Sequence, residues 1–220
     1  MKIKVCGMRE SENIQSLIAL GPDFIGFIFY NKSKRFVSDF PQVEIPLYIK
    51  KVGVFVNESI ENIFQTVTKF SLDFVQLHGN ETPEYIKELQ KKCNVESSSN
   101  YFSESFQLGI IKAFSVDENF DFGLTQQFEN TCDYFIFDTK GENYGGNGIK
   151  FNWEILKKYK GEVPFLLSGG ISKNDSEAIL SFLSKQESEK CIGLDINSGF
   201  ELNPGVKNIE DIKEFKQNLE

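Results

Sequence analysis

Two side chains that exchange protons stand at the ends of apolar segments in this 220-residue sequence. Cys6 follows the segment KIKV, and Asp138 lies near the end of the segment YFIFDT. A thiolate acts as a base or nucleophile when positive neighbours lower its pKa. Desolvation raises the pKa of a carboxyl group and keeps it available as an acid. The two residues are therefore candidates for acid-base chemistry, and the alternatives are an inert buried thiol and a capping or hydrogen-bonded carboxylate.

Two glycine-rich turns late in the sequence are candidates for binding an anion. One contains Gly169 and Gly170, and the other contains Asn197, Ser198 and Gly199. Glycine lets backbone N–H groups approach an anion closely, and a following helix adds the positive end of its dipole. A single glycine pair is most often only a turn, but two such turns together predict a phosphorylated ligand.

Arg35 and His78 are further candidates for contacts with a ligand. Arg35 lies in the charged run NKSKRF, which is either a solvated surface segment or the site of a bidentate clamp on a carboxylate. His78 comes directly before Gly79, where it either packs inside the fold or donates a hydrogen bond.

The elements that must position these residues alternate between short apolar runs and segments with helical spacing. This alternation predicts an α/β fold with a parallel sheet. Eight such units in 220 residues favour a (βα)8 TIM barrel that forms a single domain over residues 1–220. The polar stretch 93–108 predicts an irregular insertion at the bottom of the barrel, and residues 203–207 predict the start of a short helix. The expected strands are 2–6, 24–29, 51–56, 74–78, 109–115, 134–139, 164–168 and 191–197, and the clearest expected helices are 58–69, 82–91 and 175–183.

Strand parity separates apolar from polar side chains. Because successive side chains of a barrel strand alternate between lumen and helix layer, the apolar set is expected beneath the helices. The polar set then faces the lumen, and its late members lie at the carboxyl-terminal mouth, where barrel enzymes carry their sites. The alternative for Lys4, Gln76 or Asp195 is an internal polar layer. The residues expected at the mouth are Cys6, His78, Asp138, Asp195 and Asn197.

Composition excludes several classes of protein. There are 32 acidic and 24 basic side chains, for a net charge of -8, so no basic stripe is available for nucleic acid. No run approaches the roughly 20 apolar residues of a membrane span, and no signal segment is evident, so we expect a cytoplasmic protein. The four cysteines are scattered and there is one histidine, which argues against disulfides and a metal site. The four are Cys6, Cys93, Cys132 and Cys191.

A series of short motifs, running in order from the first expected strand to the last, resembles phosphoribosylanthranilate isomerase. No single motif decides the resemblance, but the ordered set is specific and covers nearly the whole chain. The motifs are KVCGM (4–8), GFIF (26–29), SKR (33–35), VGVFVN (52–57), VQLHG (75–79), FDT (137–139), GGNG (145–148), FNW (151–153), LSGGI (167–171) and GLDINSGFE (193–201).

The resemblance implies an enzyme of tryptophan biosynthesis that catalyses the Amadori rearrangement of N-(5-phosphoribosyl)anthranilate. It assigns the base to Cys6 and the acid to Asp138 and implies no metal or organic cofactor. It implies a small phosphorylated substrate held at the two glycine turns, with Arg35 facing the anthranilate carboxylate. His78 and Asp195 are expected at the same site, and the assembly is expected to be a monomer or homodimer.

Three positions depart from the family pattern. Lys34 stands where proline is common, Asn147 where threonine is usual, and Asn152 where aspartate is usual. The competing hypotheses are another phosphate-binding barrel, such as an indole-glycerol-phosphate synthase, and a non-catalytic phosphosugar-binding barrel. The synthase would need catalytic lysines and glutamates in motifs that this sequence lacks.

Overall fold

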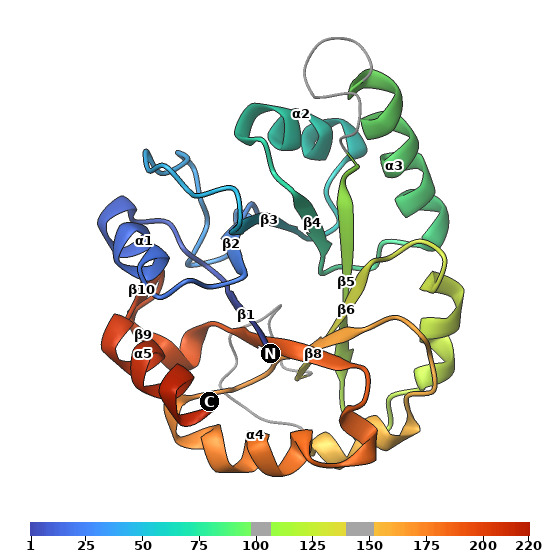
Figure 1. Ribbon diagram of the computed structural model, residues 1–220. Coiled ribbons are helices and arrows are strands. Elements are labelled where there is room, and N and C mark those ends of the chain that lie inside the picture. Colours follow the sequence, from blue (N-terminus) through green and yellow to red (C-terminus); the bar gives the residue numbers. More distant parts are fainter. Residues whose placement is uncertain (98–106, 140–151) are drawn as a thin grey trace.

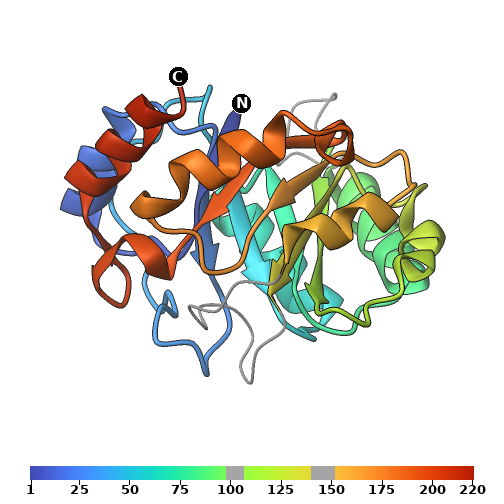
Figure 2. The same ribbon diagram turned by 90° about the horizontal axis from the view of Figure 1, so that it is seen from below.

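The computed structural model describes residues 1–97, 107–139 and 152–220, and its strands close into a parallel barrel. Each strand pairs with the next, and β8 returns to pair with β1. Figure 1 looks into the ring of strands, and Figure 2 shows both termini at the same end of it. The predicted (βα)8 barrel is confirmed, with strand ends within two residues of those expected. The strands are β1 (Lys2–Val5), β2 (Phe24–Ile28), β3 (Lys50–Phe55), β4 (Phe74–Leu77), β5 (Gly109–Val116), β6 (Tyr134–Thr139), β7 (Phe165–Leu167) and β8 (Cys191–Ile196).

Helical segments surround the barrel (Figure 1). In α2 the apolar side chains of Ile63 and Val67 are four residues apart and fully buried, and Ser59 caps the helix by accepting a hydrogen bond from the N–H of Asn62. No described helix is long and apolar enough to cross a membrane. The segments are α1 (Ser11–Ile18), α2 (Ile60–Phe70), α3 (Pro83–Ser97), α4 (Ser176–Leu183) and α5 (Ile209–Asn218), with short 3-10 turns η1 (Phe122–Phe128), η2 (Trp153–Lys158), η3 (Lys173–Asp175), η4 (Gln186–Ser188) and η5 (Ser198–Phe200).

Residues 29–49, all of them described, connect β2 to β3 without a helix. Aromatic side chains cover the barrel there instead. The rings of Phe40 and Phe70 stack with centroids 4.4 Å apart, and Phe29 stacks on Phe55 at 5.3 Å. Such pairs contribute beyond their buried area, so aromatic packing replaces the apolar stripe that a helix supplies elsewhere.

The predicted division between the two faces of each strand is confirmed. Ile3 and Val5, like Phe135 and Phe137, belong to the large core under the helices. A separate apolar cluster fills the lumen, and polar side chains take its place towards the mouth. The buried polar residues of the lumen include Lys4, Gln76 and Asp195. Lys4 belongs to an internal polar layer, whereas Gln76 and Asp195 reach the cavity at the mouth. The lumen cluster consists of Phe24, Val52, Ile111, Ala113, Ile136 and Leu166.

Two local expectations are wrong. Residues 203–207 do not begin a helix, because β9 (Glu201–Asn203) and β10 (Val206–Lys207) form an antiparallel hairpin around Gly205, whose φ of 89° suits a tight turn. Irregular structure does not begin at residue 93, since α3 continues through the first five residues of the expected insertion to Ser97. Residues 98–106 of that stretch lie outside the described residues.

The closure between β8 and β1 leaves no room for a side chain at Gly193. A Cβ there would lie 2.2 Å from the carbonyl oxygen of Lys2. Gly193→Ala is therefore expected to lower the free energy of unfolding by about 2–3 kcal/mol, measured by urea unfolding followed by circular dichroism. Gly21→Ala is the control: Gly21 is exposed with no atom within 4 Å of its Cβ, and only its φ of 58° opposes alanine, costing about 1 kcal/mol. Equal losses in the two variants would contradict the steric explanation.

Candidate active site

A cavity opens at the carboxyl-terminal end of the strands, where the lumen reaches solvent. It brings together six of the residues predicted from the sequence, which come from five different strands or the loops that follow them. Tyr30, Ser33, Gln76 and Ser168 also line it and were not among the candidates. The six predicted residues are Cys6, Arg35, His78, Asp138, Asp195 and Asn197.

Asp138 is held near the end of β6 with 7% of its surface exposed. The backbone N–H of Thr139 donates to its Oδ1 at 2.9 Å. Burial, aided by the negative charge of Asp195, raises the pKa of Asp138 to about 6. The carboxyl group is thus half protonated near pH 6, as an acid for catalysis near neutral pH requires.

His78 faces Asp138 across the cavity, with Nε2 3.5 Å from Oδ2. Burial, together with the positive charges of Lys112 and Lys4, lowers the pKa of His78 to about 3. The ring is therefore neutral at physiological pH, and the contact is not an ion pair. The Nδ1 atom of His78 lies 3.3 Å from Nε2 of Gln76, which fixes the plane of the ring.

Cys6 directly follows β1, and its N–H donates to the carbonyl oxygen of Ile196 at 2.9 Å. The side chain is 4% exposed. Burial raises the pKa of the Cys6 thiol, and this effect outweighs the opposing positive charges of Lys4 and Lys207. Desolvation thus disfavours the charged form of the Cys6 thiol more strongly than the two cations stabilise it.

Lys4 and Asp195 form an ion pair in the layer below Cys6. Lys4 is fully buried and donates from Nζ to Oδ1 of Asp195 at 2.8 Å. The ion pair satisfies both charges, so Asp195 serves first as the partner of Lys4. The pair joins β1 to β8, whose residues Lys4 and Asp195 are neighbours in register.

Arg35 makes two hydrogen bonds to a carboxylate of the protein itself. Its Nε donates to Oε1 of Glu201 at 2.8 Å and its Nη2 to Oε2 at 2.6 Å. Sequence reasoning did not identify Glu201 or the buried Lys207 beside it. The motif ending in Glu201 was a signal for that residue, but nothing in the sequence distinguishes Lys207 from a surface lysine.

The two glycine turns lie side by side, and of their residues Asn197 lines the cavity while the glycines and Ser198 do not. Gly169 and Gly170 have φ values of 92° and 64°, which side chains rarely adopt. A Cβ on Gly199 would lie 2.0 Å from the carbonyl oxygen of Ile171, so the turns after β7 and β8 touch. Ser198 begins η5 there. Adjacent backbone N–H groups at these two turns suit a phosphate group.

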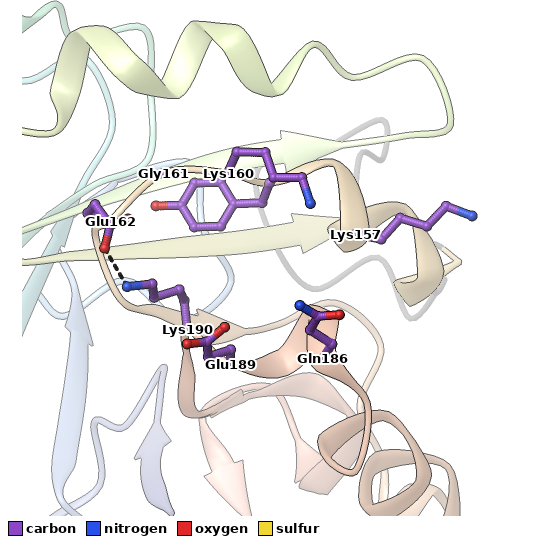
Figure 3. Close-up of a pocket in the computed structure, with 8 residues that line it drawn as sticks. Lys157, Lys160, Gly161, Glu162, Gln186, Glu189 and Lys190 are labelled. Atoms are coloured by element: carbon purple, nitrogen blue, oxygen red, sulfur yellow. Dashed lines mark hydrogen bonds and ion pairs between the residues drawn. The ribbon is translucent and has the colours of Figure 1, made fainter.

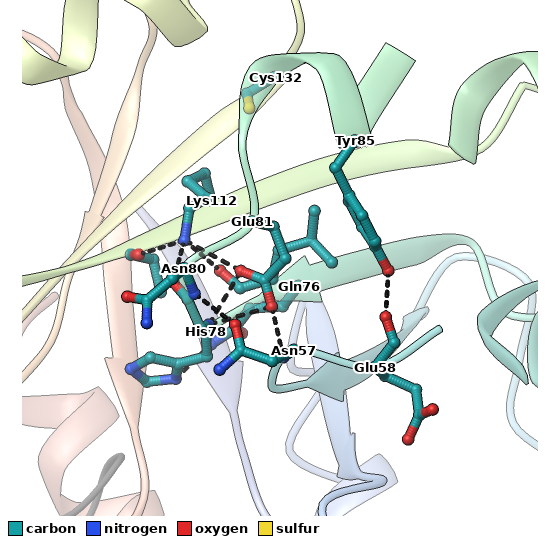
Figure 4. A network of polar contacts seen from close by, with 12 residues as sticks. Asn57, Glu58, Gln76, His78, Asn80, Glu81, Tyr85, Lys112 and Cys132 are labelled. Atoms are coloured by element: carbon teal, nitrogen blue, oxygen red, sulfur yellow. Dashed lines mark hydrogen bonds and ion pairs between the residues drawn. The ribbon is translucent and has the colours of Figure 1, made fainter. Parts of the chain in front are cut away.

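A polar network holds the turn that carries His78 (Figure 4). Glu81 accepts hydrogen bonds from the N–H groups of Asn57 and Gly79, at 2.8 and 2.9 Å. Lys112 donates to Glu81 at 3.2 Å and to the carbonyl oxygen of Gly79 at 2.8 Å. Because these bonds tie the loops after β3 and β4 together, the position of His78 depends on them.

A second hollow lies at the opposite end of the barrel (Figure 3), among residues that precede β7 and β8. Lys190 pairs with Glu162 at its edge. None of the residues proposed for acid-base chemistry lines this hollow, so the mouth remains the candidate site. The second hollow is lined by Lys157, Tyr159, Lys160, Gly161, Glu162, Gln186, Glu189 and Lys190.

Comparison with known proteins identifies the family. A family model described as N-(5'-phosphoribosyl)anthranilate (PRA) isomerase matches residues 3–218. The chain belongs to this family. It is 46% identical to the N-(5'-phosphoribosyl)anthranilate isomerase of Parabacteroides distasonis, over 100% of this chain and 93% of the relative.

Solved structures agree with this assignment. The phosphoribosyl anthranilate isomerase of Thermotoga maritima superposes with a TM-score of 0.77 at 29% identity, covering 100% of this chain and 98% of that one. A phosphoribosyl anthranilate isomerase in complex with reduced 1-(o-carboxyphenylamino)-1-deoxyribulose 5-phosphate superposes with a TM-score of 0.75 at 26% identity and the same coverage. The resemblance, the barrel and the isomerase activity in tryptophan biosynthesis expected from the sequence are confirmed.

The motifs around β6 and η2 are described in part. The GGNG motif with Asn147, and Phe151, lie outside the described residues. Asn152 is described, and its side chain caps η2 by accepting from the N–H of Glu154 at 3.0 Å. Asparagine therefore performs at this position the capping that aspartate would also perform.

The raised pKa of Cys6 has a direct chemical consequence. In a variant with Cys93, Cys132 and Cys191 replaced by serine, alkylation by iodoacetamide is expected to accelerate about tenfold per pH unit between about pH 7 and 9, because the thiol stays mostly protonated over this range. Free cysteine, whose reference pKa is about 8.5, is the control and levels off first. A rate already constant above pH 7 would show that Cys6 is a thiolate and contradict the effect of burial.

Proposed function

We propose that this isomerase converts N-(5'-phosphoribosyl)anthranilate into 1-(2-carboxyphenylamino)-1-deoxyribulose 5-phosphate with Asp138 as general acid and Cys6 as general base. The observation that carries the proposal is that these two proton-exchanging side chains, at the ends of β6 and β1, line one cavity. Both are more than nine-tenths buried, so proton transfer takes place away from bulk water.

The reaction needs one proton given to the ring oxygen of the sugar and one taken from C2, the two atoms that flank C1. Asp138 gives its proton to the furanose ring oxygen, the ring opens, and a Schiff base forms. The thiolate of Cys6 then removes the proton from C2 to give an enolamine, which tautomerises to the ketone. Each such group typically accelerates a reaction by about 10²–10⁴-fold. None of these steps uses a metal or an organic cofactor.

The two ends of the substrate are held by different groups. The phosphate binds at the turns containing Gly169–Gly170 and Asn197–Gly199, and Arg35 binds the anthranilate carboxylate. His78, as a neutral ring opposite Asp138, offers a hydrogen bond to the sugar. Asp195 contributes through Lys4. Fixing both ends places the sugar between the acid and the base, which supplies the positioning part of catalysis.

The partner that we infer is a small phosphorylated molecule rather than a nucleic acid or a membrane, since the net charge of -8 opposes binding to either polyanion. We infer a cytoplasmic enzyme that acts as a monomer or homodimer. Both states occur in one solved relative, the dimeric phosphoribosylanthranilate isomerase of Thermotoga maritima, of which monomers have been generated. Such a monomer superposes on this chain with a TM-score of 0.72 at 25% identity.

Asp138→Asn tests the acid. In an assay that follows the loss of fluorescence of freshly made phosphoribosylanthranilate, the wild-type protein is expected to accelerate the loss. The variant should be slower by about 10²-fold or more, because its amide cannot give up the proton. Affinity for a reduced product analogue should change only a few-fold. No acceleration by the wild type would reject the activity and favour a non-catalytic barrel, whereas near-normal turnover by the variant would assign the acid elsewhere.

Cys6→Ser tests the base. Serine is nearly isosteric with cysteine but far less acidic, so kcat should fall by about 10²-fold or more while the thermal unfolding midpoint hardly changes. Cys191→Ser is the matched control, since Cys191 lies at the start of β8 and does not line the cavity. Its kcat should stay within twofold. Full activity of Cys6→Ser would exclude the thiol as base.

A further inference from the structure

Lys207 is a buried cation to which the proposed mechanism gives no role. It lies in β10, and its side chain is fully shielded from solvent. Its Nζ donates to Oε1 of Glu201 at 2.6 Å and to Oδ1 of Asn197 at 2.8 Å. Burying an ammonium group is unfavourable unless a partner compensates its charge. A buried lysine next to a substrate cavity therefore requires a reason beyond packing.

Lys207 belongs to a line of three charges that ends in the cavity. Arg35, Glu201 and Lys207 are joined through the carboxylate of Glu201, which accepts hydrogen bonds from both cations. These bonds lower the pKa of Glu201 to about 2, against the effect of burial, so the carboxylate is ionised at every physiological pH. With two cations and one anion, the set carries a net charge of +1.

Glu201 occupies one edge of the Arg35 guanidinium and leaves another available. The Nε and Nη2 atoms both donate to Glu201. Nη1 makes no hydrogen bond to any described residue, and Arg35 lines the cavity. A planar guanidinium can bind a second carboxylate through its Nη1–Nη2 edge. An Arg35–Glu201 pair alone would be neutral, however, and a neutral pair attracts a carboxylate weakly.

The arrangement is fixed by tight packing. A Cβ on Gly7, which has a φ of 75°, would lie 2.6 Å from Cδ of Arg35 and 2.8 Å from Oδ1 of Asn197. The N–H of Gly205, in the hairpin turn, donates to Oε1 of Glu201 at 3.0 Å. The hairpin thus brings the anion and the second cation together at the rim of the cavity.

We propose that Lys207 is a positioning residue for recognition of the substrate carboxylate: it offsets the charge of Glu201 and so leaves Arg35 with a net positive charge for that group. The proposal rests on the proposed function, in which Arg35 binds the anthranilate carboxylate. Glu201 orients the guanidinium, and Lys207, by offsetting the charge of Glu201, lets the oriented guanidinium attract the substrate carboxylate.

The test compares two inhibitors that differ by one group. One is reduced 1-(o-carboxyphenylamino)-1-deoxyribulose 5-phosphate, and the other is the same compound with hydrogen in place of the carboxylate. The ratio of their inhibition constants measures what the carboxylate contributes. Lys207→Met is expected to reduce this ratio about tenfold or more, with affinity for the carboxylate-free compound changed only a few-fold.

A compensating variant separates charge from folding. Glu201→Gln combined with Lys207→Met again leaves a net charge of +1, so its ratio should exceed that of Lys207→Met and approach the wild-type value. Should Lys207→Met fail to fold, Glu201→Gln, with a net charge of +2, is compared with the double variant, and the single variant should show the larger ratio. Urea unfolding of each variant identifies those that fold.

Three results would overturn the proposal. The first is a ratio of inhibition constants that is unchanged in Lys207→Met but collapses in Arg35→Ala. That result would keep Arg35 as the group that binds the carboxylate and exclude a role for Lys207. The second is an equal loss of affinity for both inhibitors, which indicates a purely structural role. The third is a ratio unaffected by Arg35→Ala, which rejects the carboxylate assignment itself and with it this inference, while the acid and base of the proposed function are tested separately.

Discussion

The ion pair between Lys4 and Asp195 joins the first strand of the barrel to the last and lies below the groups that exchange protons. Its two charges act on all of them. Asp195 raises the pKa of Asp138, Lys4 lowers the pKa of His78, and the two have opposite effects on the pKa of Cys6. Because the pair is buried, its charges are poorly screened, and removing either partner would leave an uncompensated charge beneath the site.

Burial shifts the pKa of the two reacting groups in the same direction but with opposite consequences for their roles. It raises the pKa of Asp138 and of Cys6 alike, since it disfavours the charged form of each. For an acid this effect is useful, because the proton is retained up to about pH 6. For a base it is a cost, because the thiolate becomes scarcer. The lysines at positions 4 and 207 reduce that cost without removing it, so burial favours giving a proton from Asp138 more than taking one at Cys6.

The charged side chains at the rim of the cavity are paired, as Lys4 and Asp195 are in the lumen. Glu201 is shared by two cations, Arg35 and Lys207, and Lys112 is shared by Glu81 and backbone carbonyl groups. The bonds of Arg35 to Glu201 join the segments that follow β2 and β8. Those of Lys112 to Glu81 and Gly79 join β5 to the loop after β4 (Figure 4). Close approach of glycine backbone at Gly7 and Gly79 permits these contacts, since a Cβ at Gly7 would overlap Arg35 and a Cβ at Gly79 would overlap Glu81.

The sequence by itself determined the strands, their inward and outward faces, and the gathering of Cys6, His78, Asp138 and Asp195 at one end. This was possible because the period of two in apolar residues sets which side chains are buried, and parallel strands end at one mouth. Only the tertiary structure decided the pKa of Cys6, the hairpin at 201–207 and the partners of Arg35. Glu201 is 166 positions from Arg35, and Asp195 is 191 positions from Lys4. Ionisation and pairing depend on distance and dielectric in three dimensions, which residue spacing along the chain does not contain.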